Sequence, residues 1–201
     1  MRLLMTFAIL FLCGTTAIFL VLQHKEQAIQ TYNHLRLFLL DGKGPKCLIE
    51  LEKIGAKFQP IGNQGTKECP VLNAVKLIKI NYTNLSSAVI LSCPAAMKFS
   101  QWAQEIKAKN ISHIGALNCR TMRGSRIRSE HSFGLAIDIT AIDDAVVSKH
   151  WTEDSRRGEK LRLAARSACK YFSNVLTPNT NKLHKNHFHF DDGLGRNCDI
   201  R

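Results

Sequence analysis

The chain has 201 residues, with 28 Lys and Arg against 16 Asp and Glu, and its formal net charge is +12. This length corresponds to one domain plus a tail rather than to several domains. A charge this positive is compatible with nucleic-acid binding, but the sequence contains no nucleic-acid-binding motif. We therefore expect no nucleic acid as a partner.

The N-terminal segment is expected to anchor the chain in a membrane. Residues 3–22 contain no charged side chain, and about 20 apolar residues are enough to span a bilayer. Arg2 precedes this stretch, which favours a cytoplasmic N-terminus. No small-x-small cleavage site follows it, so we predict an uncleaved signal anchor over residues 1–23, with a cleaved signal peptide as the alternative. In both cases a stalk (24–44) connects to a domain (45–201) outside the cytoplasm.

The domain alternates helical and strand patterns. A short helix is expected to begin at Pro45 and to end at Gly55, a residue typical of a helix C-terminal cap. Two β segments, 71–80 and 87–92, precede a helix that begins at Pro94 and buries Phe99 and Trp102. The remaining expected elements are a strand at 111–120, a basic loop, a strand at 133–142, a helix at about 157–176 and a strand at 186–191. This order predicts an α+β fold, in which a small antiparallel sheet carrying the functional site is flanked by about three helices.

The cysteines indicate a disulfide framework. Of seven cysteines, one (Cys13) lies in the apolar segment, and the other six are Cys47, Cys69, Cys93, Cys119, Cys169 and Cys198. No two of these six have the C-x2–4-C spacing of a zinc–thiolate site. An even number in an exported domain favours disulfides, and the sequence leaves about 15 pairings open.

Two short segments carry the candidate chemistry. The first, SEHSFGLAID at 129–138, contains His131 and Asp138, and the second, LHKNHFHFD at 183–191, contains His184, His187 and His189. Catalytic zinc takes three protein ligands from His and carboxylate side chains. Since residues two apart in a strand share a face, His187 and His189 can point into one pocket, one as a ligand and the other as a base. An H-x-H pair alone is more often a solvated strand, so the prediction rests on the two segments together.

These residues resemble a known group of enzymes. The pattern S-x-H-x-x-G-x-A-x-D followed by H-x-H is similar to that of the LAS group of peptidoglycan zinc peptidases, which includes D-Ala-D-Ala carboxypeptidases and murein endopeptidases. Finer features resemble the bacterial extensin-like C-terminal domain family, over about residues 45–201. They are Cys93-Pro94 before a helix with Trp102, the pair Cys119-Arg120, the helix end Ala168-Cys169 with Phe172, and the terminal HFHFD.

The resemblance implies a role for each site residue. His131, Asp138 and His189 would bind Zn²⁺, and His187 would be the general base. His184 matches a further histidine of the penicillin-insensitive murein endopeptidases, where it steadies the base or the oxyanion. The carboxypeptidases use a Glu shortly before the last His, and its absence here favours an endopeptidase.

Three neighbouring residues have less direct roles. Arg120 resembles an arginine of the carboxypeptidases that could pair with a substrate carboxylate or stabilise an oxyanion, and a plain surface charge is the alternative. Ser129 is expected to bond to the substrate or to cap the turn. Asp191 is expected to orient an imidazole rather than to bind metal.

We therefore expect a zinc-dependent hydrolase that cuts peptidoglycan stem peptides or crosslinks, held at the inner membrane with its domain in the periplasm of a bacterium. One alternative is a catalytically silent wall-binding module on the same fold. Another is a non-enzymatic envelope scaffold. The basic cluster Arg120, Arg123, Arg126 and Arg128 would attract anionic wall polymers.

Overall fold

The computed structural model describes residues 20, 23–25, 27–29, 31, 44–198 and 200. The chain divides into two compact units, Met1–Phe38 and Leu39–Arg201. Among the described residues, no helix is both long enough and apolar enough to cross a membrane. The predicted anchor (1–23) and stalk (24–44) fall largely outside the described residues, and both stay predictions.

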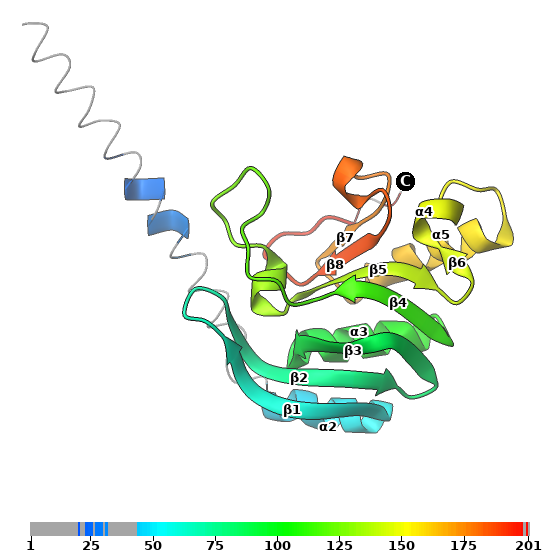
Figure 1. The fold of residues 1–201 in the computed structure, drawn as a ribbon, viewed down its shortest axis with the longest axis horizontal. Helices are drawn as coiled ribbons and strands as arrows, with labels where there is room; N and C mark the ends of the chain where they lie inside the picture. Colours follow the sequence, from blue (N-terminus) through cyan, green and yellow to red (C-terminus); the bar gives the residue numbers. More distant parts are fainter. Residues whose placement is uncertain are drawn as a thin grey trace, which may run out of the picture. The chain divides into compact units, whose positions relative to one another are not determined.

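In the described part of the second unit, eight strands form one mixed sheet (Figure 1). They are β1 (Ala56–Gly65), β2 (Pro70–Ile80), β3 (Thr83–Ser92), β4 (Asn110–Gly115), β5 (Ala136–Ile142), β6 (Ala145–Val146), β7 (Asn174–Leu176) and β8 (Phe188–Asp191). The strand order is β1-β2-β3-β4-β5-β8-β7, and β6 pairs with β5. Neighbours are antiparallel except β3 and β4, which run parallel.

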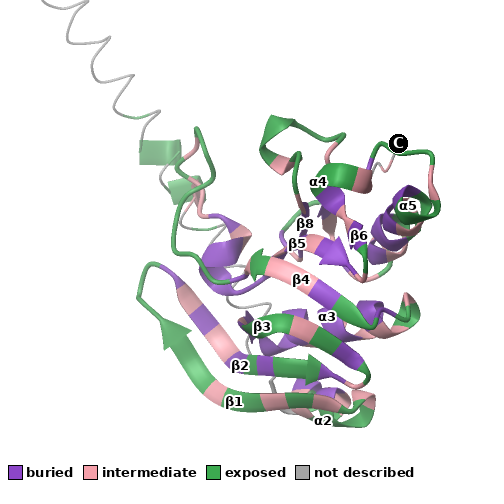
Figure 2. Cartoon of the chain, turned by 45° about the vertical axis from the view of Figure 1, so that its right-hand side comes forward, coloured by how far each residue is buried: buried purple, intermediate pink, exposed green. Residues whose placement is uncertain are grey.

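The helices of this unit include the three that the sequence predicts. The described helices are α2 (Gly44–Ile54), α3 (Cys93–Glu105), α4 (Val147–His150) and α5 (Arg156–Ala168), with two 3-10 turns, η1 (Glu130–Phe133) and η2 (Lys182–His184). Figure 1 shows α2 and α3 together along one face of β1–β3. Figure 2 shows that α3 and α5 carry many buried positions, whereas β1 is mostly exposed.

Alternation along β5 and β8 separates the core from the opposite face of the sheet. Ile137 and Ile139 in β5 are buried, as are Phe188 and Phe190 in β8. The ring of Phe190 packs edge-on against Trp102 of α3, with centroids 5.1 Å apart. Because side chains alternate between faces of a strand, the residues between these apolar ones point to the other side of the sheet.

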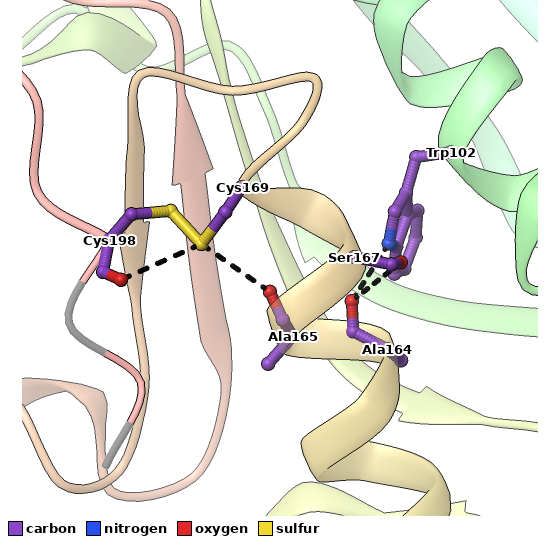
Figure 3. Close-up of a disulfide and its surroundings, with 6 residues drawn as sticks. All are labelled: Trp102, Ala164, Ala165, Ser167, Cys169 and Cys198. Atoms are coloured by element: carbon purple, nitrogen blue, oxygen red, sulfur yellow. Dashed lines mark hydrogen bonds between the residues drawn. A yellow bond between two sulfur atoms is a disulfide. The ribbon is translucent and has the colours of Figure 1, made fainter.

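The predicted position of Trp102 in the core is confirmed. Its side chain is fully buried, and its indole Nε1–H donates a 3.0 Å hydrogen bond to the carbonyl oxygen of Ala164 in α5 (Figure 3). This bond satisfies the one polar atom of the ring, which would otherwise be costly to bury. Trp102 therefore joins α3 to α5 over the same face of the sheet.

The predicted disulfide framework is confirmed for all six cysteines of this unit. The pairs are Cys47–Cys93, Cys69–Cys119 and Cys169–Cys198, which enclose sequence separations of 46, 50 and 29 residues. The first joins α2 to α3, and the third, drawn in Figure 3, ties the chain after β8 to the end of α5. Each bridge typically stabilises a fold by about 2–4 kcal/mol.

The sheet is larger than predicted, and not entirely antiparallel. Residues 56–65, for which no strand was predicted, form the edge strand β1. This segment contains Pro60 and three exposed glutamine and asparagine side chains, so it has no apolar alternation. Its pairing with β2 accommodates the irregular sequence through three register shifts.

The strands and helix around the site are shorter than predicted. The strand expected at 111–120 ends at Gly115, because the backbone beyond it bonds to the segment at η1, as in Asn118 N–H to His131 O at 3.1 Å. The strand expected at 133–142 begins at Ala136, and the one expected at 186–191 begins at Phe188. The helix expected at 157–176 ends at Ala168, because 174–176 pairs with β8 as β7.

Candidate metal centre

Two strands place the first two candidate ligands side by side. In the antiparallel pairing of β5 with β8, Asp138 lies directly opposite His189. Both side chains point away from the helix-covered face, because each is flanked in its strand by buried apolar residues. Strand register therefore joins two residues that are 51 positions apart in the sequence.

The third candidate ligand, His131, comes from the 3-10 turn η1 and not from a strand. The turn ends at Gly134, which adopts a left-handed conformation with φ of 64°. A Cβ at this position would lie 2.7 Å from Val71 Cγ1 and 2.9 Å from Ser92 N, so glycine is needed for both the turn and the close packing. The turn directs the buried ring of His131 toward Asp138 and His189.

One potential metal-ligand atom of each of the three side chains points to a common centre. His131 Nε2 lies 3.2 Å from Asp138 Oδ1 and 3.1 Å from His189 Nδ1, and the last two atoms are 2.9 Å apart. Two ligand atoms of a tetrahedral zinc ion, each at about 2.0–2.1 Å from it, lie about 3.3 Å from each other. The spacing of the three side chains would therefore allow all of them to coordinate one such ion.

The outward nitrogens of both imidazoles are held by acceptors. His131 Nδ1 donates to the carbonyl oxygen of Ala116 at 2.7 Å, and His189 Nε2 donates to Asp191 Oδ2 at 2.9 Å. These bonds select the tautomers in which the inward nitrogens carry a lone pair. Two lone pairs and a carboxylate that face one another require a cation or a proton between them, and a metal ion meets that requirement.

The electrostatics of the cluster agree with this arrangement. Burial would lower the pKa of His189, but its hydrogen bonds to Asp138 and Asp191 outweigh burial and raise the pKa to about 9. Burial would raise the pKa of Asp138, yet the hydrogen bonds from His131 and His189 hold this pKa well below its usual range. The site therefore strongly favours positive charge at its centre.

His187 and His184 border the same site. His187 Nε2 lies 3.7 Å from Asp138 Oδ1, and its Nδ1 is 2.8 Å from Asn186 Oδ1. The ring of His184 lies 5.3 Å from that of His187 and 5.6 Å from that of His189, measured between centroids. Burial lowers the pKa of both, and that of His184 falls to about 4. Both are therefore neutral imidazoles near pH 7.

Arg120 lies at a small cavity beside the candidate ligands. The cavity has a volume of about 250 Å³, and Arg120, His131 and Asp138 are among the residues that line it. The Arg120 backbone is fixed by Ser132, whose hydroxyl accepts from Arg120 N at 3.0 Å and donates to Arg120 O at 2.7 Å. Arg120 thus shares this cavity with two of the candidate ligands, whereas His184, His187 and His189 are not among the residues that line it.

Of the two roles expected for Ser129, capping of the turn is not observed, and contact with a substrate stays a prediction. Ser129 is buried and its side chain makes no capping hydrogen bond to η1, although its backbone N–H donates to Arg120 O at 3.0 Å. Glu130 lies in the 3-10 turn and approaches Gly193, where an added Cβ would lie 2.4 Å from Glu130 Oε1 and 3.0 Å from Asp191 Oδ1.

Sequence patterns missed three contributors to the site. The Ala116 carbonyl is a backbone group, so no side-chain pattern indicates it. Asn186 and Asn181 orient His187 and His184 through their amide oxygens, each at 2.8 Å from Nδ1. Asn181 precedes His184 by three residues and is the N-cap of η2, and Asn is a preferred N-cap residue, so the sequence contained a signal for this contact. Asn186 directly precedes His187, and its adjacency was the only signal.

A comparison with protein families matches residues 45–199 to the family described as extensin-like protein C-terminus. The chain belongs to this family. The match spans the second unit almost completely, and the extensin-like domain includes all of the candidate ligands. Neither the curated proteins nor the solved structures contain a match to the chain.

Proposed function

We propose that the extensin-like domain is a zinc-dependent hydrolase that cuts peptide bonds of peptidoglycan, as an endopeptidase rather than a carboxypeptidase. The observation that carries this proposal is the convergence of His131 Nε2, Asp138 Oδ1 and His189 Nδ1 within 2.9–3.2 Å of one another. Two imidazoles and one carboxylate are a ligand set of catalytic zinc, with a fourth position left open. When bound, zinc acts as a Lewis acid that activates water at neutral pH and polarises a carbonyl group.

His187 is the best candidate for the general base. It is a neutral imidazole whose Nδ1–H is directed to Asn186 Oδ1, so the lone pair of Nε2 faces the site. It would accept the proton of the attacking water and return it to the leaving amine. A general base must lie close to the metal without being one of its ligands. His187 fits this position, because its Nε2 lies 3.7 Å from Asp138 Oδ1, farther than the 2.9–3.2 Å that separate the three candidate ligand atoms.

His184 and Arg120 would assist from two sides. His184 is neutral and its ring lies against those of His187 and His189, so it would steady the base or donate a hydrogen bond to a developing oxyanion. Arg120 brings a permanent positive charge to the cavity. It would pair with a substrate carboxylate or stabilise the oxyanion.

The choice of peptidoglycan rests on the similarity of the two motifs to those of the LAS peptidases. The basic cluster Arg120, Arg123, Arg126 and Arg128 would hold the domain near anionic envelope polymers. Three disulfides among the described residues favour an oxidising compartment. We therefore place the domain in the periplasm of a bacterial envelope, held by the predicted anchor.

The test is digestion of purified sacculi by the full chain after loading with zinc, with released fragments identified by mass spectrometry. Hydrolysis should release fragments with new amine and carboxylate ends, and His131→Ala should release none. The wall-binding module would be favoured instead if a zinc-loaded chain bound sacculi and cut none from several wall types. A chain that binds no zinc would contradict the proposal and favour the scaffold.

A further inference from the structure

The open face of β1–β4, which the helices do not cover, has an uneven distribution of charge. These four strands contain three lysines (Lys57, Lys76 and Lys79) and no arginine, aspartate or glutamate. All three lysines are exposed (Figure 2). Buried residues adjoin two of them, since Val75 and Leu77 flank Lys76 and Ile80 follows Lys79. Because side chains alternate between the faces of a strand, the lysines point away from the core.

A row of four directly paired residues crosses this open face. Lys57 lies opposite Lys79 in the pairing of β1 with β2. The row continues from Lys79 to Asn84 and, through the parallel pairing of β3 with β4, to Asn110. All four residues are exposed. Since neighbouring strands lie about 4.8 Å apart, the row extends over roughly 14 Å. It therefore suits an extended ligand that lies across the strands.

The lysines of the open face have no counter-charge in the part of the chain that the structure describes. None of the three forms an ion pair there, whereas Lys98 and Lys160 each pair with an aspartate. Like charges directly opposite each other destabilise a pair of strands, and Lys57 and Lys79 are placed in this way. An anionic ligand on the open face would relieve this repulsion.

The two amides of the row indicate what the anion is attached to. Asn84 Nδ2 donates to Asn110 Oδ1 at 3.3 Å, which leaves Asn84 Oδ1 to accept and Asn110 Nδ2 to donate. A sugar hydroxyl does both, so it matches this pair. Phosphate polymers favour arginine, and nucleotide bases favour exposed aromatic rings. These strands have no arginine, and Phe58, their one phenylalanine, tyrosine or tryptophan, pairs with the buried Leu77.

The row and the candidate metal centre lie on the same side of the sheet. The helix α3 packs against β2 and β3, and its Trp102 packs against Phe190 of β8, so one face is covered across these strands. Asp138 and His189 point away from that face, as do the residues of the row. A polymer held on the open face is therefore not separated from the candidate centre by the sheet.

We propose that the open face of β1–β4 binds a carboxylate-bearing glycan strand, with the carboxylates at the three lysines and hydroxyls at Asn84 and Asn110. This binding goes beyond the proposed hydrolase activity, because no residue of the row is a candidate metal ligand or base. Single exposed ion pairs contribute little, so the affinity depends on several contacts made at once by one strand. It should fall as salt rises, because exposed charges are screened.

The test titrates the zinc-free full chain with an alginate oligosaccharide, in which every sugar carries a carboxylate, and measures binding by calorimetry. A neutral maltooligosaccharide of the same length should bind about tenfold more weakly, because it lacks the ion pairs. Replacing Lys57, Lys76 and Lys79 together with Gln should weaken alginate binding by about tenfold, since each exposed ion pair contributes a factor of about 1.4–5. The matched control replaces three exposed lysines of α2 and α4 with Gln (Lys46, Lys53 and Lys149), and it should weaken binding less than about twofold.

A second variant tests the sugar part of the ligand. Asn84→Ala with Asn110→Ala removes the two amides and no charge, at exposed positions. It should weaken the binding of alginate about threefold or more, since each hydrogen bond contributes about 0.5–1.5 kcal/mol. The same variant should bind polyglutamate, which has carboxylates but no hydroxyls, as the wild type does.

The proposal is overturned if the wild type does not bind alginate or binds both oligosaccharides equally, if the two lysine variants lose affinity equally, or if the asparagine variant binds alginate unchanged. Tighter binding of a single-stranded DNA oligonucleotide than of alginate would also overturn it, in favour of a phosphate polymer. Digestion of sacculi separates it from the hydrolase proposal. Zinc-loaded chain that cuts nothing while its open face binds alginate contradicts only the hydrolase, and hydrolysis without alginate binding contradicts only the glycan surface.

Discussion

At the scale of single residues, the candidate centre depends on how each imidazole is held. His131 and His189 each direct one nitrogen to a fixed acceptor, so the other nitrogen is committed to the cluster. His187 has its Nδ1 committed to Asn186, which leaves Nε2 free to exchange a proton. The three histidines therefore differ in whether they can bind a metal or exchange a proton, because the hydrogen-bond partners of their identical imidazole rings differ.

This difference predicts separate effects of substitution. Replacing His131, Asp138 or His189 with Ala should abolish tight zinc binding, since a three-ligand site loses its geometry with any one ligand. Replacing His187 with Ala should leave zinc bound and lower turnover by about 10²–10⁴-fold, the usual contribution of a positioned proton-transfer group. Metal analysis after dialysis and rates on sacculi measure the two effects. His113→Ala is the control, because His113 bonds to Ser87 O in β3 and lies outside the site.

If His187→Ala lost the metal and His189→Ala kept it, the two roles would be exchanged. Full activity of every variant would contradict both roles. The sequence alone does not assign the two roles, because His187 and His189 belong to the same H-x-H pair and only their neighbours distinguish them.

At the scale of elements, the segment 116–120 connects β4 to the candidate metal centre. It supplies the Ala116 carbonyl to His131, and Ser132 holds the backbone of Arg120. The Cys69–Cys119 disulfide fastens the same segment to the turn between β1 and β2. A disulfide here restrains the groups that orient a ligand, whereas Cys47–Cys93 restrains two helices on the covered face.

Removing these two disulfides should therefore have different effects. Both enclose similar loops, of 50 and 46 residues, so each Ser double variant should lose a comparable part of the unfolding free energy, about 2–4 kcal/mol. Cys69→Ser with Cys119→Ser should in addition weaken zinc binding by about 10–100-fold, as loss of an orienting group does. Denaturant unfolding and chelator competition measure the two quantities. Equal zinc affinity in both variants would contradict a role of segment 116–120 at the site.

A second prediction at this scale concerns Asp143, in the turn between β5 and β6. Its carboxylate accepts from the backbone N–H groups of Lys109 and Asn110, both at 2.8 Å, and pairs with Lys160 of α5. Burial would raise the pKa of Asp143, but these partners outweigh it and lower the pKa. Asp143 therefore joins the start of β4 to α5.

Because the folded pKa of Asp143 lies below the unfolded value of about 3.9, its stabilisation is present above about pH 4 and is lost as pH falls through the folded pKa. Asp143→Asn keeps an acceptor for the backbone and removes the charge. At pH 7 it should lower the unfolding free energy by no more than about 1 kcal/mol, since the ion pair is partly exposed. The difference from wild type should shrink toward pH 2 in denaturant titrations, and a constant difference would show that charge is not its cause.

At the scale of the whole molecule, the proposed location of the domain rests on its disulfides and on the predicted anchor. The three bridges among the described residues would not persist in a reducing cytosol. The charge of +12 would hold an exported domain against anionic polymers and weaken that attraction as salt rises. Both features are consistent with the proposed action at an envelope surface.

A reporter fused after Arg201 should accordingly be active only outside the cytoplasm. A phosphatase that needs its own disulfides should be active, a fluorescent protein that requires the cytosol should be dark, and mass spectrometry should find Met1 retained. A clipped chain beginning near residue 23 would remove the anchor but leave export intact. Activity of the cytosolic reporter would contradict export itself.

The sequence alone was enough to predict the helices α2 and α3, the pairing state of the cysteines and the alternation that turns Asp138 and His189 to the same face of the sheet. These features are local, because they depend on spacing within one segment or on a count of residues. The sequence did not reveal β1, whose Pro60 and glycines lack a strand pattern and are tolerated only because β2 pairs with them through bulges. The helix predicted for α5 was also too long at its C-terminal end. The helical apolar spacing continues through 169–176, but residues 174–176 pair with β8 instead.

Three features depend on the packing of the whole domain: which cysteines pair, which nitrogen of each histidine faces the candidate centre, and the hydrogen bond from His131 to the backbone carbonyl of Ala116. Strand register set the Asp138–His189 contact across 51 residues, and a left-handed turn at Gly134 added His131. Such contacts join residues far apart along the chain. Their geometry therefore depends on how the sheet and helices pack, which no pattern within a single segment contains.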